Sequence, residues 1–593
     1  MTPIAFSRRT TSVLALPILC LSLAACTPEA PGANNINGAS SRIAGGKAST
    51  MSDAQFDTLP MDTQYKVVNK LLSTLYNGMP VDEFYDIASG TATDKRRDPD
   101  FTLSDIRDAL NDPLTSQDKS ALDTIITGSE AQNTEEEIEP RFRFDRNRPK
   151  QMPLARMFQY PLSRDSYSQW MAWHLANTIL FSPAEEIDSA DITDVQNLFR
   201  RLDLQIMSGT RIRDMIAVHQ RSVQNWRRFR SPEDNTREMI EIYLGLFDKD
   251  DDVPRASQAC QDLYLTDESD GYKLAYSDYP NSDPVLVLNQ YVTNCNDFYD
   301  LIAGHPLLIP RVTSVLVDYF LAGASVEQRL QMTQAISASN PQTFDDIFTA
   351  ILFSSTYLLD TEREKSFEEA YMGTAKRLRW DAHPDVFRGM TSGNGAIGRA
   401  NMNEMGWSTM SFKLGRVTRV PMDSLSFGNY HKAIRETLLL DQNRWRISLG
   451  LEAPRAPSPE PVKPIAVDAS ARDRAAYEAD VQAYQEQVNA LQGDERRQYA
   501  QDLEAYEEKA AHYKLIDDMN TEQLIDYLFL TVIQRRATVL ERNELSDVFS
   551  AEGYLDPEFN NMFARSGKQD DIARITFDYL SRLPEAYYLP SLH

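Results

Sequence analysis

Apolar residues recur at helical spacing along most of the chain from about Met61 onward. In the segments 67–75 and 344–352 they fall three or four positions apart, so they share one face of a helix. Strand-like alternation of apolar and polar residues is scarce. The pattern therefore predicts an all-α protein, and the length allows two or three helical units.

Three segments repeat the order of an apolar helix, a short turn and an acidic second helix. They begin at Val67, Ser314 and Gln523. Loose repeats of this kind are typical of stacked helical hairpins, although three copies are too few to define a solenoid. We therefore expect a multi-helix array of helical hairpins.

The most regular pattern lies in residues 467–515. Two apolar series with spacing 4-3-4-3 are separated by Gln492-Gly493-Asp494, where Gly493 can turn the chain and Asp494 can cap the next helix. The spacing predicts an antiparallel, coiled-coil-like hairpin whose arms pack together. The alternative is an outward-facing seam. The series are Tyr477, Val481, Tyr484, Val488 and Leu491, then Tyr499, Leu503, Tyr506, Ala510 and Tyr513.

Changes in composition divide the chain into seven parts. Residues 129–152 lack periodicity and are expected to form a loop, and residues 452–464 hold five prolines, which predicts an extended linker. The expected parts are a signal peptide 1–25, a disordered tether 26–55, an N-terminal helical region 56–150, a helical core 151–451, the linker 452–466, the hairpin 467–515 and a C-terminal helical region 516–593.

The N-terminal segment has the pattern of an export signal. Arg8 and Arg9 precede an apolar run, and small residues then lead to Cys26. This order resembles the lipobox of bacterial lipoproteins, which implies that Cys26 becomes lipidated, and Thr27 favours the outer membrane. An ordinary secretory peptide with a chance cysteine is the alternative. No later stretch approaches the roughly 18 apolar residues of a membrane helix.

Charge and cysteine content restrict the partners and the covalent structure. The formal net charge of −26 repels phosphate backbones, so nucleic acid is not an expected partner. In an exported protein Cys260 and Cys295 are expected to form a disulfide, and two buried free thiols are the alternative.

Cofactor motifs are weak in this sequence. Gly393 to Gly398 match G-x-G-x-x-G, but no apolar strand precedes them, so a dinucleotide loop is not expected. The seven histidines form no pair at metal-ligand spacing, and there is no C-x-x-C motif. We therefore expect neither a cofactor nor a structural metal.

The densest polar segment is 219–247, which Pro232 divides into two helices. Arg237, Glu238 and Glu241 lie within little more than one helical turn. One interpretation is an acid pair that acts with an arginine on a bound ligand. The other, which we favour, is a charge network that joins the two helices.

The order of motifs in residues 150–450 resembles a family of exported bacterial helical proteins, domain-of-unknown-function family 1800. Two departures are Ala176, where the family has histidine, and Pro232-Glu233-Asp234, which replaces its N-E-N. The family has no established reaction, and its late glycine and tryptophan loop has no known nucleotide role. The resemblance rests on Trp173-His174, residues 210–219, Arg237 to Ile242, Asp252-Val253, His305-Pro306, residues 351–358, Gly398 and Gly406-Trp407.

Two functions follow as hypotheses. The favoured one is a lipid-anchored, non-catalytic binding or assembly factor of the bacterial envelope; the resemblance implies exported sulfatase-like proteins as partners. The rival is an envelope hydrolase or transferase in which Arg237, Glu238, Glu241 and His174 line one cleft, with burial raising the pKa of one carboxyl group.

Overall fold

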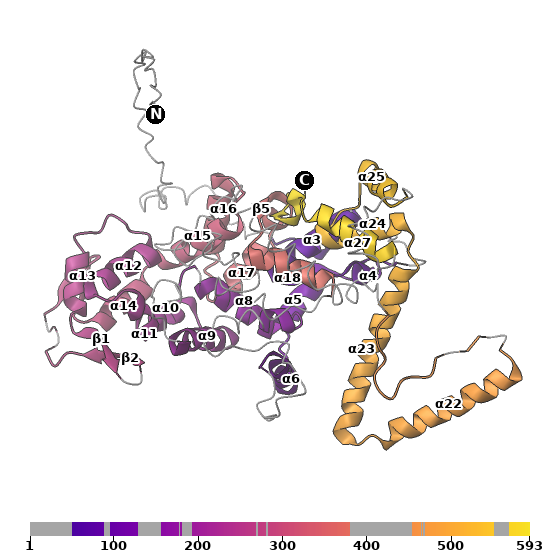
Figure 1. Cartoon of the computed structure of the whole chain (residues 1–593). Coiled ribbons are helices and arrows are strands. Elements are labelled where there is room, and N and C mark those ends of the chain that lie inside the picture. The colour runs from indigo at the N-terminus through magenta and orange to yellow at the C-terminus, as the bar shows by residue number, and fades with distance from the viewer. Residues whose placement is uncertain are drawn as a thin grey trace, which may run out of the picture. The chain divides into compact units, whose positions relative to one another are not determined.

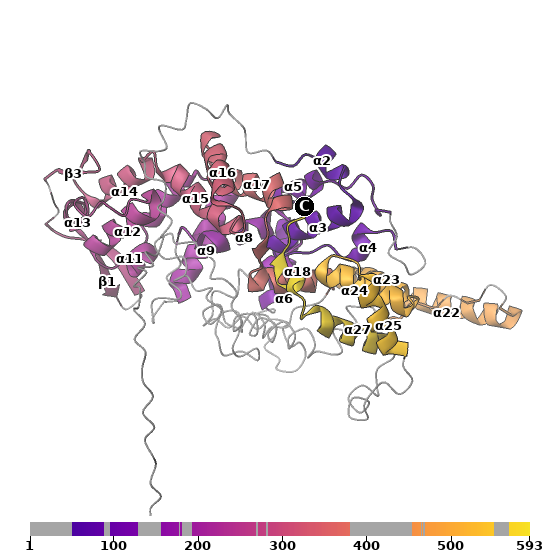
Figure 2. The same ribbon diagram turned by 90° about the horizontal axis from the view of Figure 1, so that it is seen from above.

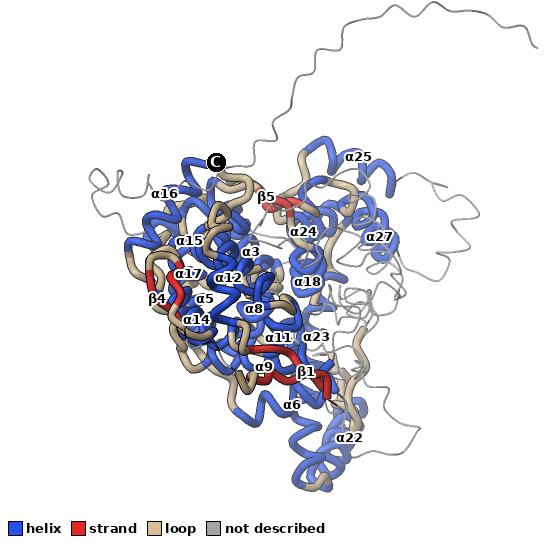
Figure 3. The backbone as a smooth tube through the Cα atoms, turned by 90° about the vertical axis from the view of Figure 1, so that its left-hand side faces the viewer, coloured by secondary structure: helices blue, strands red, loops and turns tan. Residues whose placement is uncertain are grey.

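Helices dominate the described chain, which confirms the all-α prediction (Figure 1). Among the described residues, strands form three short antiparallel pairs, shown in red in Figure 3. The structure is a computed structural model, and it describes residues 50–87, 95–127, 156–176, 178–180, 192–268, 271–279, 281, 283–379, 453–463, 465–466, 469–550 and 568–592.

The described chain begins with ordered contacts inside the predicted tether. The Met51 N–H donates to the Phe353 carbonyl at 2.8 Å, and Met51 is buried. Ser52 and Gln55 cap the next helix through a capping box. The first helices are α2 (Asp53–Asp57), α3 (Met61–Thr74), α4 (Val81–Phe84), α5 (Leu103–Asn111) and α6 (Ser116–Thr127).

Helix α8 (Arg164–Ala176) is buried on every side, since each residue from Asp165 to Ala176 is buried. It packs against α5 and α9, and the Trp170 indole N–H donates to the Thr74 carbonyl at 2.6 Å. The helices that follow are α9 (Ile192–Met207), α10 (Ile212–Gln220), α11 (Val223–Arg228), α12 (Pro232–Leu244) and α13 (Val253–Cys260).

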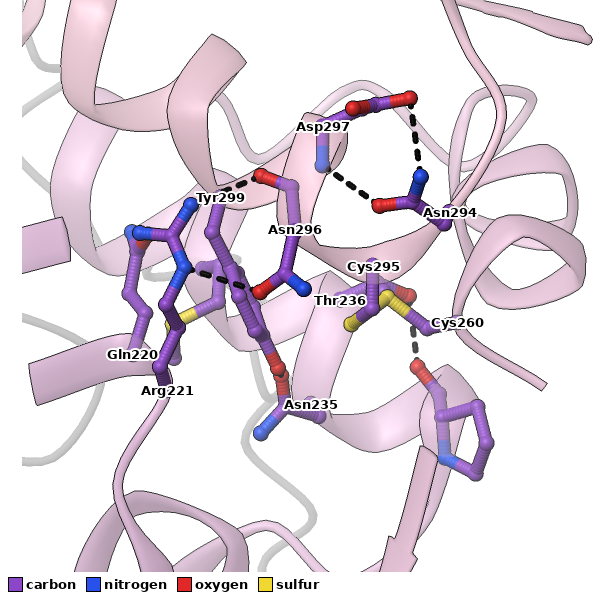
Figure 4. Close-up of a disulfide and its surroundings, with 12 residues drawn as sticks. Gln220, Arg221, Asn235, Thr236, Cys260, Asn294, Cys295, Asn296, Asp297 and Tyr299 are labelled. Carbon is purple, nitrogen blue, oxygen red and sulfur yellow. Dashed lines mark hydrogen bonds between the residues drawn. A yellow bond between two sulfur atoms is a disulfide. The ribbon is translucent and has the colours of Figure 1, made fainter. Parts of the chain in front are cut away.

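Two strand pairs lie between α13 and α14 in the chain, and a disulfide joins the two helices. Cys260 ends α13 and Cys295 begins α14, and their disulfide confirms the predicted pairing (Figure 4). Beside it, Arg221 Nε donates to Asn296 Oδ1 at 2.9 Å. The elements are β1 (Leu263–Glu268), β2 (Gly271–Tyr276), β3 (Val285–Val287), β4 (Gln290–Val292) and α14 (Cys295–Gly304).

Two of the three predicted repeats form packed helix pairs. The repeat from Ser314 packs as α15 and α16, and the repeat from Gln523 packs as α24 and α25. In the repeat from Val67, α3 packs chiefly against α18 instead. The elements after α14 are α15 (Leu308–Phe320), α16 (Val326–Ala338), α17 (Phe344–Leu352), η2 (Thr356–Asp360), β5 (Arg363–Glu364) and α18 (Phe367–Arg377).

Segments from both ends of the chain share one core. Helices α3, α18 and α24 lie side by side (Figures 1 and 2). Lys70 Nζ donates to the Pro590 carbonyl at 2.9 Å, and Arg377 Nε donates to the Thr531 carbonyl at 2.6 Å. The last elements are α24 (Thr521–Ile533), α25 (Val539–Ser550), α27 (Lys568–Leu580), η4 (Pro584–Ala586) and β6 (Tyr588–Leu589), which pairs with β5.

The predicted hairpin forms as two helices, α22 (Ala471–Ala490) and α23 (Gly493–Asp517). Gln492, rather than Asp494, caps α23, in a capping box with Glu495, and Gly493 is the first helical residue. The predicted packing between the arms is wrong for most of their length: no residue of α22 is buried, and the helices diverge from their connection (Figure 1). They meet through the hydroxyl groups of Tyr484 and Tyr499.

The far end of α23 belongs to the core rather than to a separate appendage. His512 and Ile516 are buried, and His512 Nδ1 lies 3.6 Å from Asp82 Oδ2. Among the described residues, no single helix has the length and apolar character to cross a bilayer. Helices α14 and α15 pass the same test of length and composition when they are taken together, but they form a pair bent by 66°.

Candidate functional site

The predicted polar patch lies on α12. Ser231 caps this helix by accepting from the Asp234 N–H at 3.1 Å, and Pro232 occupies its first turn. Arg237 points toward the surface, where it donates to Asp250 at 2.5 Å and to Glu233 at 3.5 Å. The hydrogen bond to Asp250 raises the pKa of Arg237. The principal partner of Arg237 is therefore Asp250, beyond the helix.

Glu238 lies on another side of α12 and is buried, whereas Glu241 is half-buried. Glu238 interacts electrostatically with Arg228 at the end of α11; burial lowers the pKa of Arg228 to about 10, and Glu238 opposes that shift. Arg237 and Glu238 thus face different surroundings. One contact joins α11 to α12, and the other joins α12 to the loop beyond it.

His174 lies in the aromatic core beside α3 and α15. Its Nε2 is 3.3 Å from the Tyr76 hydroxyl group, and its ring centroid is 4.4 Å from that of Trp170. The rings of Tyr319 and Phe320 also contact it. These neighbours lie on α8, on α15 and directly after α3, whereas the patch lies on α12.

A fully buried ion pair lies outside the predicted residues. Arg363 and Glu369 have side chains that are 1% and 0% exposed and form two hydrogen bonds of 2.7 and 2.6 Å. Arg363 also donates to Tyr357 at 2.9 Å and to Thr74 at 3.0 Å. Glu369 accepts from the backbone N–H of Ser366, the N-cap of α18. The S-x-x-E pattern of Ser366 and Glu369 is the one signal in the sequence that indicates part of this arrangement.

Two buried lysines hold the C-terminal segment. Lys70 Nζ donates to the carbonyls of Thr361 and Pro590, and Lys365 Nζ donates to those of Glu585 and Ala586. Burial lowers the pKa of each lysine to about 7. A neutral amine has two N–H groups, which suffice for the two carbonyls that each lysine contacts. Both nitrogen atoms are thus committed to backbone oxygens.

The hydrogen bonds of Arg363, Lys70 and Lys365 connect parts of the core and leave no charged group exposed at these positions. Arg363 contacts a carboxylate and two hydroxyl groups, and its pKa is raised by Glu369 against the effect of burial. Within the described ranges, no group of three His, Cys, Asp or Glu side chains is placed to hold a metal ion.

The chain matches no protein-family model, and comparisons with curated proteins and with solved structures found no match. The likeness to family 1800 stays a prediction. The signal peptide, Cys26, the glycine motif Gly393 to Gly398 and the Gly406-Trp407 pair lie outside the described residues.

Proposed function

We propose that this protein is a lipid-anchored protein of the bacterial envelope that acts as a non-catalytic binding or assembly factor. The observation that carries the proposal is α22, a helix of 20 residues with no buried residue. Most helical stability in proteins comes from packing of an apolar face, so a helix with such a face exposed is a candidate for a partner. Val481 is 36% exposed on that face.

The surroundings of the predicted catalytic residues support a non-catalytic role. A shared reaction centre needs its groups within hydrogen-bond reach of one substrate. Arg237 pairs with Asp250 at the surface, whereas His174 is enclosed by aromatic rings of the core. The observed contacts give these side chains structural partners in two separate environments.

The lipobox ending at Cys26 supports anchoring to a membrane, and the net charge of −26 disfavours nucleic acid as a partner. A lipidated N-terminus followed by a polar tether would leave the helical body free to contact other envelope proteins. The family resemblance suggests an exported sulfatase-like protein as one such partner.

Co-purification from detergent-solubilised envelopes tests this function. The tagged full-length chain is isolated with and without a crosslinker, beside a Val481→Gln variant and an Ala479→Gln control on the opposite face of α22. We expect the same partner, either another envelope protein or an untagged second copy of this chain, to accompany the wild type and the control, and to be depleted from the Val481→Gln sample. Recovery of the tagged protein without another envelope protein and without a crosslinked second copy would contradict an assembly role.

A further inference from the structure

We propose that α22 pairs in antiparallel orientation with α22 of a second copy of this chain. The inference rests on the proposed assembly role, and it names the partner of the exposed helix. It is carried by the spacing of the apolar residues on α22, by their exposure, and by the register that the connection to α23 imposes.

The apolar face of α22 has the geometry of a coiled-coil seam. Tyr477, Val481, Tyr484 and Val488 are spaced 4-3-4, which places them along one side of the helix. None of them is buried, and Val481 is among the exposed large apolar residues of the protein. Tyr484 contacts α23 through its hydroxyl group, and the other seam residues are at most partly covered, so most of the seam is available to another helix.

Closure of α22 onto α23 would produce a poor seam. The connection between Ala490 and Gly493 and the contact between the Tyr484 and Tyr499 hydroxyl groups set the same antiparallel register. In that register Tyr477 faces Tyr506, so two large side chains compete for the same space between the helices. Val488 falls opposite Glu495, whose carboxylate already accepts from the backbone N–H of Gln492 at 3.4 Å. We attribute the divergence of the two arms to this mismatch.

Pairing of α22 with itself removes the mismatch. If Val481 faces Tyr484 of the second copy, the two-fold axis places Tyr477 opposite Val488 of the second copy. Each of the four layers then holds one tyrosine and one valine, an alternation of large and small residues that fills a helix interface evenly. The order of the layers is the same when it is followed along either helix. The pairing is therefore self-complementary, and it forms a two-fold symmetric dimer to which no further copy can be added.

The residues that flank the seam are compatible with this register. Glu478 of one copy lies nearest Gln485 of the other, and Asp480 lies nearest Gln487. At these two positions carboxylates therefore meet amide groups, which can donate hydrogen bonds. At each end Leu491 faces the aliphatic part of Arg474, which can cover an apolar residue while its guanidinium group stays in water.

The interface would be small, because only 20 residues of each chain take part. Stable protein interfaces usually bury at least about 1,200 Å² in total, so we expect a reversible dimer in dilute solution. Two copies anchored in one membrane leaflet have a high effective concentration, which favours the pairing without any new contact. Membrane attachment would thus promote assembly.

Cysteine crosslinking tests the register directly. The full chain carrying Cys20→Ser and Cys26→Ser, with the Cys260–Cys295 disulfide intact, is prepared as Val481→Cys and, with a different tag, as Tyr484→Cys. We expect mild oxidation of the mixture to give the mixed-tag disulfide dimer. Val481→Cys alone should crosslink poorly. The two substituted positions are offset by about 4.5 Å along the helix axes, and the axes lie about 8–10 Å apart, so the two sulfur atoms are too far apart for a disulfide.

The matched control uses Ala479→Cys with Glu486→Cys. In the proposed register these positions lie at the same level as each other but on the outer faces of the two helices, so they should not crosslink. Sedimentation equilibrium supplies a second measurement. Val481→Glu should lower the association constant by about 100-fold, because each dimer would bury two carboxylates, whereas Ala479→Glu should leave it unchanged.

A mixed-tag dimer from Val481→Cys and Tyr484→Cys, absent from the control pair, supports antiparallel pairing. Efficient crosslinking of Val481→Cys with itself would indicate parallel helices and would overturn the proposal, as would a monomer at all concentrations. If envelope co-purification then still recovers another protein, the assembly role stands and only the self-pairing is wrong. If neither experiment finds a partner, both are wrong.

Discussion

Replacing Glu369 by glutamine should destabilise the core much more than a comparable change at the surface. The substitution keeps the size of the side chain but removes the negative charge that faces Arg363. Arg363 stays 1% exposed, with its guanidinium group bonded to Tyr357 and Thr74. A buried cation would thus lose its counter-charge.

The expected cost follows from burial and geometry. Loss of one partner from a buried ion pair typically costs about 3–5 kcal/mol, because the remaining charge cannot regain water. Combining Glu369→Gln with Arg363→Met removes both charges, so the double variant should lose less stability than the sum of the two single variants. Asp250→Asn is the matched control, since its pair with Arg237 is exposed and is expected to contribute at most about 1 kcal/mol.

Equilibrium urea denaturation at pH 7, followed by far-ultraviolet circular dichroism, measures these changes. Glu369→Gln should shift the midpoint strongly with an unchanged slope, and Asp250→Asn should shift it little. If Glu369→Gln costs no more than Asp250→Asn, the buried pair does not stabilise the fold and the reasoning is refuted. Additive single and double variants would show that the two side chains act independently.

Three further predictions concern other parts of the chain. Between pH 7 and 9 buried Lys70, whose pKa is about 7, releases its proton, whereas a lysine in the unfolded chain keeps it. The free energy of unfolding should therefore rise with pH, by up to about 1.4 kcal/mol per pH unit. Lys70→Met should lower that slope in urea titrations, and an unaltered slope would contradict the assignment. Cys260 and Cys295 should resist a thiol reagent in the unfolded, unreduced protein and react after reduction; labelling before reduction would disprove the disulfide. Cys26→Ser should move the protein from the membrane to the soluble fraction, and retention on membranes in high salt would exclude lipid anchoring.

In the hairpin, the spacing of apolar residues predicted the two helices but not how they pack. The 4-3-4-3 spacing correctly indicated two helices, because helix formation depends on periodicity within a segment. Whether their seams meet depends on which residues the short connection places opposite each other. Tyr477 would oppose Tyr506 and Val488 would oppose Glu495, and this mismatch becomes visible only once the register is known.

The candidate site shows a similar division. The sequence identified Arg237, Glu238 and Glu241 as a dense group, but spacing along a helix does not tell which side faces the core. In the structure Arg237 reaches Asp250 while Glu238 is buried near Arg228. His174, which the enzyme hypothesis placed in the same cleft, lies among aromatic rings instead.

The sequence by itself determined the helical class and the disulfide partners of this protein. Helical spacing recurs throughout, and Cys260 and Cys295 are the two cysteines outside residues 1–26. Only the tertiary structure decided that Lys70 contacts Pro590, 520 positions later. Periodicity reflects the geometry of one helix, whereas partners so distant along the chain are selected by packing and by the need of buried polar groups for hydrogen bonds.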